Sequence, residues 1–409
     1  MLDMIGLMGL FPKEYEETIL NNSIGGVQNA ANNFQWGIVK GMDRVDDVNF
    51  RIINSLYVGS YPKRYKEKKI PYFKFEHAFG KKDINVGFCN ITVYKNLSKY
   101  IGIKKEIDKW AKVGIHSNKV VIAYAMTSPF VEILKYIKKT YPDILCILVV
   151  PDLPEYMNVA SESKYLYRKL KKIQVNHFKR NLKKIDGYVL LTDAMKEWFD
   201  EEINYVVVEG IASRIIEETN NTYSSNNKKS ILYAGMIEEK YGVLDLVKSF
   251  MKIENDEWEL NLYGVGQSLE KIKEISKIDN RVNIHGIVQN SLVREEQKKA
   301  DILINPRNDN HEFTKYSFPS KIIEYMSSGT PMIGYKLSGM PDEYRKYFYE
   351  IPQTDNGIYE TLIEVMSKTD DQRKKMGMEA LEFIKNKKNS KIQCEKILEL
   401  VYSLKNSSK

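Results

Sequence analysis

The sequence predicts an α/β protein with two doubly wound, Rossmann-like domains of parallel sheet. Short apolar runs alternate with longer segments of helical periodicity, which is typical of parallel strands covered by helices on both faces. At 409 residues, the chain is too long for one ordinary hydrophobic core. A polar, Asn- and Ser-rich segment at 217–229 lies near mid-chain. We therefore expect two domains facing a cleft, with ligands beyond the carboxyl ends of the strands.

The domain change is expected at Glu209, so that residues 1–208 form the first domain and residues 209–390 the second. Apolar runs predict strands at 120–125, 145–150, 187–192, 205–208, 230–234, 259–263, 282–285, 301–304 and 331–335. The apolar first residues predict another buried strand rather than a secretory leader, because Asp3 interrupts them and no basic segment precedes them. A final helix at about 391–405 can pack back onto the first domain.

The composition is that of a globular protein of the cytoplasm. Hydrophobic residues make up 43% and charged residues 28%. No apolar run approaches the roughly 18–20 residues of a membrane-spanning helix. The three cysteines are widely spaced and fit neither a disulfide framework nor a metal site, which suits a reducing compartment.

The net charge of +8 lies entirely within residues 1–210. Most of it belongs to the stretch 161–184, where nine Lys and Arg face one Glu and apolar residues recur at helical spacing. Such a helix can dock on an anionic membrane surface, or it can simply present a solvated charged face. The stretch has no recognised nucleic-acid motif, so we expect no nucleic-acid partner.

Three glycine-containing loops precede predicted helices and can approach a phosphate group. Their candidate residues are Gly25, Gly26, Gly235, Lys240, Gly264 and Gly266. Each is weak alone, since a glycine is usually just part of a turn and a lysine is usually just solvated. The third loop lacks the last glycine of a dinucleotide fingerprint, which argues against NAD.

The segment 301–334 carries the strongest signal. A buried strand ends in Pro306 and is followed by Arg307; a helix is then expected at 319–328, with Ser317 as a candidate cap. The start of this helix near Ser320, together with Arg307 and Lys321, predicts an anion site. Glu324 lies one turn further and can accept two hydroxyl hydrogen bonds, as from a ribose. The alternative is a surface pair of Lys321 with Glu324, worth about 0.5 kcal/mol or less.

This segment resembles the retaining glycosyltransferases of family 4, which have the GT-B fold, and particularly the bacterial capsule and exopolysaccharide members. The resemblance is most specific in NPR…EFTKYSFPSKIIEYMSSGTP at 305–331. Weaker matches follow in the family's order: GGV near the start, PDLPEYM at 151–157, VLLT at 189–192, YAG…KYGVLDLV at 233–247, LYGVG at 262–266, VNIHGIV at 282–288 and KADILINP at 299–306.

The resemblance implies a role for each matching position. Arg307 and Lys321 would contact the donor diphosphate, with Ser320 beside them, and Glu324 would bind the nucleotide ribose. Ile287 and Val288 would lie at the nucleobase. In the first domain, Gly25 and Gly26 would face the diphosphate and Asp152 would lie in the acceptor-side loop; with Arg307 and Lys321, Asp152 is a candidate catalytic residue.

The implied activity is transfer of a hexose, with retention of configuration, from a nucleotide diphosphate-sugar to a glycan acceptor in surface polysaccharide synthesis. A UDP-sugar is the expected donor, and a lipid-diphosphate-linked glycan is the expected acceptor. The enzyme would work at the inner face of the cell membrane. No metal or other cofactor is expected, because the sequence has no DxD-like carboxylate pair in a plausible loop and no His cluster.

The sequence departs from the family pattern at three positions. Tyr316 stands where the family has the first acid of its Glu-x7-Glu pattern, although Glu312 lies nearby. Met236 and Tyr241 replace an arginine and a lysine. These departures keep two alternatives open: a non-catalytic GT-B scaffold subunit and a nucleotide-sugar epimerase.

Overall fold

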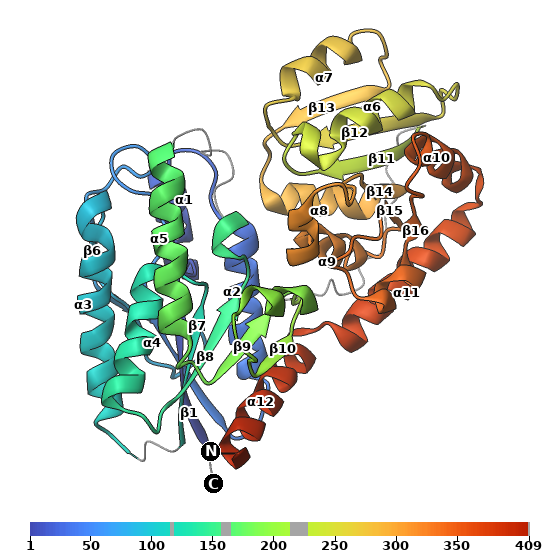
Figure 1. Ribbon diagram of the computed structural model, residues 1–409. Coiled ribbons are helices and arrows are strands. Elements are labelled where there is room, and N and C mark those ends of the chain that lie inside the picture. The colour runs from blue at the N-terminus through green and yellow to red at the C-terminus, as the bar shows by residue number, and fades with distance from the viewer. Residues whose placement is uncertain (115–117, 157–164, 213–227, 408–409) are drawn as a thin grey trace. The chain divides into compact units, whose positions relative to one another are not determined.

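The computed structural model describes residues 1–114, 118–156, 165–212 and 228–407 and divides the chain into two compact units (Figure 1). Unit 1 comprises Met1–Ser213 and Ser390–Lys409, and unit 2 comprises Arg214–Asn389. This division falls a few residues beyond the predicted change at Glu209 and places the C-terminal segment in unit 1. Most of the predicted linker lies outside the described residues, but its last residue, Lys229, already belongs to a strand.

Unit 1 contains an eight-stranded sheet in the order β10-β9-β8-β7-β1-β2-β5-β4. Its strands are β1 Leu2–Met8, β2 Val48–Asn54, β4 Phe73–Phe75, β5 Asp83–Asn85, β7 Lys119–Tyr124, β8 Leu145–Val150, β9 Gly187–Leu190 and β10 Tyr205–Val207. All neighbours pair in parallel except β4 with β5. Both faces of β7 and β8 are buried, which explains their unbroken apolar sequences. A separate small pair joins β3 Lys69–Ile70 to β6 Phe88–Cys89.

Helices cover both faces of this sheet (Figure 1). The helix α4 Ser128–Thr140 packs between α3 Thr92–Ala111 and α5 Tyr165–Leu182. A short helix, α1 Glu16–Asn22, precedes α2 Asn29–Met42. The C-terminal helix α12 Ser390–Ser407 packs against α2. Gly41 permits this close contact, because a methyl group built there would lie 2.3 Å from the sulfur of Cys394.

Unit 2 contains a six-stranded parallel sheet in the order β13-β12-β11-β14-β15-β16. Its strands are β11 Lys229–Ala234, β12 Trp258–Tyr263, β13 Val282–Gly286, β14 Ile302–Asn305, β15 Met332–Gly334 and β16 Tyr349–Glu350. Its helices are α6 Val243–Met251, α7 Leu269–Ser276, α8 Asn290–Lys299, α9 Ser320–Met326, α10 Gly357–Ser367 and α11 Asp370–Lys387. The chain order runs outward from β11 to β13 on one side and from β14 to β16 on the other. The topological switch point is therefore between β11 and β14, where ligands bind in such sheets.

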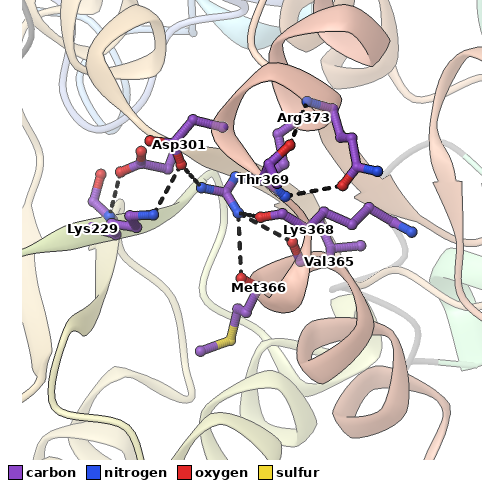
Figure 2. A network of polar contacts seen from close by, with 10 residues as sticks. Lys229, Asp301, Val365, Met366, Lys368, Thr369 and Arg373 are labelled. Carbon is purple, nitrogen blue, oxygen red and sulfur yellow. Dashed lines mark hydrogen bonds and ion pairs between the residues drawn. The ribbon is translucent and has the colours of Figure 1, made fainter.

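A polar network closes the opposite, amino-terminal edge of this sheet (Figure 2). Arg373 is 2% exposed and donates hydrogen bonds to the last carbonyl groups of α10, and it also pairs with Asp370. Asp301, before β14, accepts a hydrogen bond from the backbone nitrogen of Ser230 at 2.8 Å. Burial raises the pKa of Asp301. Asp301, the first residue of the segment singled out in the sequence, thus has a structural role away from the candidate site.

Across the described part of the chain, no helix is both long and apolar enough to cross a membrane.

Candidate functional site

The predicted donor residues of unit 2 gather at the carboxyl ends of β11 and β14, the switch point of the sheet. Gly235 follows β11, and Arg307 follows β14 after the buried Pro306. The loops here pack closely: a methyl group at Gly242 would lie 2.1 Å from the carbonyl oxygen of Pro306. One at Gly264 would lie 1.8 Å from that of Gly235. This packing, together with positive φ angles of 74° and 133°, explains why both positions are glycine.

Gly264 and Gly266 were predicted as donor-binding residues, and both have a packing role. A methyl group at Gly266 would lie 2.1 Å from the carbonyl oxygen of Ile237. The backbone nitrogen of Ile237 in turn donates to the carbonyl oxygen of Val265 at 2.9 Å. These glycines therefore hold the loop after β12 against the loop after β11, whether or not a ligand lies there.

Lys321 lies on the backbone at the end of β11. A methyl group built at Gly235 would be 2.3 Å from Cε and 2.6 Å from Nζ of Lys321. Tyr325, which is fully buried, fixes α9 at this place: its hydroxyl accepts a hydrogen bond from the nitrogen of Ala234 at 2.9 Å and donates to the oxygen of the same residue at 3.3 Å. Burial lowers the pKa of Lys321; Glu324 opposes this shift and the nearby Arg307 adds to it.

Arg307 is oriented by the loop that follows it. Its Nη2 donates to the hydroxyl of Ser317 at 2.7 Å, and its guanidinium carbon lies 4.7 Å from the ring centroid of Phe313. The prediction that Ser317 caps α9 is wrong. The helix begins at Ser320, has Pro319 at its cap position without a side-chain hydrogen bond, and ends at Met326, so it is shorter than the predicted 319–328. Ser317 instead accepts from the arginine, because the intervening Phe318–Pro319 places it outside the helical turn.

Glu324 is exposed on α9 and is held from a different helix. Its Oε1 accepts a hydrogen bond from Nε2 of Gln297, on α8, at 2.8 Å. The alternative prediction of a surface pair between Lys321 and Glu324 is wrong: among the described residues the two form no ion pair, because each lies against another element. Gln297 was not predicted, since nothing in the local sequence shows that a glutamine on one helix reaches a carboxylate on the next.

Other predicted donor residues line the same edge with fewer contacts. Ile287, which is 77% exposed, and Val288 follow β13. Lys240 is only partly available to an anion, because it forms an ion pair with Glu238 at 2.8 Å. Tyr316 ends the 3-10 helix Glu312–Tyr316, and the amine of Lys315 lies 5.5 Å from its ring centroid.

A stacked pair at the carboxyl ends of β12 and β13 was not predicted as part of the site. The rings of Tyr263 and His285 are 4.3 Å apart and nearly parallel, and Nε2 of His285 lies 2.7 Å from Oδ1 of Asn261. Burial lowers the pKa of His285, so the neutral ring is favoured. The only sequence signal was an aromatic residue and a histidine, each at the end of a predicted strand.

The remaining predicted residues belong to unit 1. Gly25 and Gly26 are exposed before α2, and a methyl group at either would meet no heavy atom within 4 Å. Gly25 has a φ of 89°, which favours glycine. Asp152 is exposed directly after β8, and its charge adds to the effect of burial in raising the pKa of Tyr124. In the described ranges, no three His, Cys, Asp or Glu side chains are grouped as a metal site.

Comparisons with known proteins bear on the family of unit 2 and on the fold of the chain. Residues 228–367 match the sequence model of the family "Glycosyl transferases group 1". No curated protein sequence matches the chain. Among solved structures, sucrose-phosphate synthase from Thermosynechococcus elongatus is 13% identical, with a TM-score of 0.66, and the alignment covers 99% of this chain and 100% of the other.

Two further structures were solved with UDP. TarM of S. aureus, in complex with fondaparinux, α-GlcNAc-glycerol and UDP, is 12% identical with a TM-score of 0.59, covering 98% of this chain and 99% of the other. The pneumococcal O-GlcNAc transferase GtfA, in complex with UDP and GlcNAc, is 11% identical with a TM-score of 0.57 at the same coverage. At these identities the likeness concerns the fold, and it confirms the predicted two-domain GT-B architecture. Residues 228–367 thus match the group 1 glycosyl transferases on a GT-B fold, which supports sugar transfer as the activity of the chain.

Proposed function

We propose that this protein is a retaining hexosyltransferase that takes its sugar from a UDP-sugar. The observation that carries the proposal is the arrangement at the switch point of unit 2: two neighbouring cations, Arg307 and Lys321, and an exposed carboxylate, Glu324, which is not paired with either among the described residues. A nucleotide diphosphate has the complementary groups, namely two phosphates and a ribose diol.

The two cations would act on the leaving group. When the bond between the anomeric carbon and the phosphate oxygen breaks, negative charge grows on the diphosphate, and preorganised cations lower the barrier by stabilising it. Retention follows if the acceptor oxygen attacks on the face that the phosphate leaves. The acceptor proton then passes to the departing phosphate oxygen, so that no protein nucleophile is required.

The nucleoside would lie along the same edge of the sheet. Glu324 would accept hydrogen bonds from the ribose hydroxyls, and the backbone of Ile287 and Val288 would contact the base. Uracil is the proposed base because two structures of the same fold contain UDP. Unit 1 would bind the acceptor, with Asp152 in the loop after β8.

We also propose that the acceptor is a lipid-diphosphate-linked glycan used in surface polysaccharide synthesis, and that unit 1 docks on an anionic membrane surface in the cytoplasm. Exposed cations support this proposal: Lys169, Lys172 and Arg180 on α5, and Lys184 just after it. Residues 157–164 of the predicted basic stretch lie outside the described residues. Ile173, expected on the apolar face, is instead 58% exposed among these cations.

A ridge on α3 provides a second reason for membrane docking. Val93, Leu97 and Ile101 recur at a spacing of four residues and are 80%, 59% and 58% exposed, and the exposed Lys105 and Lys109 continue the same ridge. The helix α4, which packs between α3 and α5, adds the exposed Lys135 and Lys139. Apolar side chains beside lysines fit an interface of acyl chains and anionic headgroups.

The donor proposal is tested with a panel of UDP-, GDP- and ADP-sugars. We expect UDP to raise the unfolding temperature most, and one UDP-sugar to release UDP slowly in a phosphorus NMR experiment. With an acceptor, the anomeric coupling constant of the product should match that of the donor. Binding of UDP without turnover of any donor would favour the scaffold alternative, which the tyrosine at 316 and the methionine at 236 keep open.

Membrane docking is tested separately by sedimentation with vesicles. We expect binding to phosphatidylglycerol vesicles at low salt and weaker binding to phosphatidylcholine vesicles, because the attraction is about 1 kcal/mol per basic residue near the surface. Leu97→Asp with Ile101→Asp should abolish binding without changing the affinity for UDP. Equal binding of this variant to anionic vesicles would show that α3 does not enter the interface.

A further inference from the structure

We infer that Gln297 and Gly235 are positioning residues that keep Lys321 and Glu324 from neutralising each other, so that both remain available to the donor. This inference rests on the proposed donor site. Gln297 was not predicted as a site residue. Gly235 was predicted to bind the donor, whereas the inferred role is to position Lys321.

Lysine and glutamate three residues apart lie on the same face of a helix and can form an ion pair. In this chain Lys273 pairs with Glu270 at 2.8 Å, and Lys277 pairs with Glu274 at 2.7 Å. In both of these pairs the glutamate precedes the lysine, which is the more favourable order for an ion pair on a helix. However, Lys104 and Asp108 have the lysine first, four residues before the acid, and still pair at 2.7 Å. Among the described residues Lys321 and Glu324 form no ion pair, as is also true of Lys396 and Glu399 at the same spacing on α12; what distinguishes Lys321 and Glu324 is that each lies against a residue of another element.

Gln297 holds the acid away from the lysine. It is 1% exposed, so its amide has few other orientations, and its Nε2 donates to Oε1 of Glu324 at 2.8 Å. The backbone carbonyl oxygen of Gln297 accepts a hydrogen bond from the hydroxyl of Thr330 at 2.7 Å, and this bond connects α8 to the segment after α9. One carboxylate oxygen of Glu324 is thus occupied, and the exposed remainder of the group can accept from hydroxyl groups.

Gly235 gives the lysine a different place to lie. Because glycine has no side chain, Cε and Nζ of Lys321 rest on the backbone at the end of β11, on the side where Arg307 lies near enough to affect its charge. An added methyl group would meet the far end of the flexible Lys321 side chain, which can move, and would lie 2.9 Å from the hydroxyl of the buried Tyr233; none of its three nearest atoms belongs to the backbone. Gly235→Ala should therefore displace the ammonium group without unfolding the protein. The absence of a positive φ at this position supports the same expectation.

The two residues act on different parts of the donor, which makes their roles separable. Loss of the Gln297 amide would let Glu324 turn toward Lys321 and withdraw from the ribose. Displacement of Lys321 by a methyl group would weaken contact with the diphosphate and leave the ribose contact in place. The ribose hydroxyls and the phosphates can be tested one at a time with UDP, 2′-deoxy-UDP and pyrophosphate.

The decisive experiment is a double-mutant cycle measured by calorimetry on the full chain. Gln297→Met keeps the length of the side chain and removes its donors, and it should weaken UDP binding about tenfold. In the Glu324→Ala background, Gln297→Met should have no further effect, because the glutamine acts through the glutamate. The single variant Gln297→Met should also lose the preference for UDP over 2′-deoxy-UDP. Glu295→Gln, on the exposed side of the same helix, is the matched control.

The second arm uses Gly235→Ala. We expect it to weaken UDP and pyrophosphate to a similar extent, about tenfold, while the preference for UDP over 2′-deoxy-UDP is retained. Additive effects of Gln297→Met and Glu324→Ala, or unchanged UDP affinity in folded Gln297→Met and Gly235→Ala, would overturn the inference alone. If the unmodified protein bound no nucleoside diphosphate, the donor site itself would be refuted, and the inference with it.

Discussion

Lys321 and Glu324 lie one helical turn apart, yet each owes its position to a residue on another element. Lys321 lies on Gly235 at the end of β11, and Glu324 is held by Gln297 of α8. Arg307 is set in turn by Ser317 and Phe313. Packing between elements therefore decides which charged groups at this site remain unpaired. If Gly235 and Gln297 did not hold Lys321 and Glu324 in place, the two side chains could turn toward each other and form an ion pair.

Replacing Lys321 should affect turnover more than stability. We expect Lys321→Ala to lower kcat about a hundredfold, because one preorganised charge at a leaving group is worth that much or more. Stability should hardly change, since burying a charge without a paired carboxylate costs free energy and the variant removes that cost. Kinetics with the donor and a thermal melt measure both quantities. Lys271→Ala, an exposed lysine on α7, is the control, and an unaltered kcat for Lys321→Ala would exclude the leaving-group role.

At the scale of elements, polar side chains join helices and strands that the apolar core alone would not hold in register. In unit 1, His77 joins the β4–β5 hairpin to the end of α2, with Nδ1 at 2.6 Å from Asp83 and Nε2 at 3.1 Å from Asp43. In unit 2, Arg373 joins the end of α10 to the start of α11 (Figure 2). Both connections bury charge, and both satisfy that charge with several oxygen atoms.

His77 should make the stability of unit 1 depend on pH. Burial alone would lower its pKa, but the hydrogen bonds to Asp43 and Asp83 outweigh burial and raise it to about 9. A raised pKa stabilises the folded state fully below the ordinary value of about 6.5 and loses that contribution as the pH rises through 9. At pH 7 the contribution is roughly 2–3 kcal/mol. We expect urea unfolding of the unmodified protein to show decreasing stability from pH 7 to pH 10. His77→Gln should be less stable at pH 7, and its stability should depend less on pH. Parallel pH profiles of the two proteins would contradict this role of His77.

Arg373 should be essential to the stability of unit 2. Arg373→Ala leaves the carbonyl groups of Val365, Met366 and Lys368 without their buried donor, and we expect it to lower the free energy of unfolding by about 2–4 kcal/mol. Arg345→Ala is the control, because Arg345 and its partner Glu350 form an exposed ion pair, which solvent screens and which contributes little to stability. Calorimetric scans would measure the difference. Equal losses of unfolding free energy in Arg373→Ala and Arg345→Ala would contradict a special structural role for the buried Arg373.

At the scale of the whole molecule, the chain begins and ends in the same unit. The core of unit 1 contains Cys394, Ile397, Leu398 and Val401 of α12, packed with residues of α2. The final segment therefore completes a domain whose other residues precede unit 2 in the sequence. The net charge is unevenly distributed along the chain. The excess of +8 lies within residues 1–210, and residues 211–409 are close to neutral.

Removing residues 390–409 should unfold unit 1 and spare unit 2. Each buried apolar side chain contributes about 1.5–3 kcal/mol, so losing four of them removes an amount comparable to the whole stability of a domain. We expect the truncated protein to show one calorimetric transition and rapid proteolysis within residues 1–213. Two transitions at unchanged temperatures would show that α12 is dispensable to the core.

The sequence alone determined the architecture and the edge of the sheet at which the candidate site lies. Unbroken apolar runs predicted β7, β8, β11 and β14 nearly to the residue, because strands buried on both faces tolerate little else. Proline, glycine and charge at 305–331 likewise selected the loop after β14. These are local signals, which depend on neighbours in the chain.

Only the tertiary structure decided how that site is arranged. It gave Ser317 to Arg307 rather than to the start of α9, separated Lys321 from Glu324, and revealed Gln297 as the partner of Glu324. These contacts join residues that lie 10 to 86 positions apart in the sequence. No periodicity records them, because the distance between two side chains on different elements is set by how the elements pack and not by their spacing along the chain.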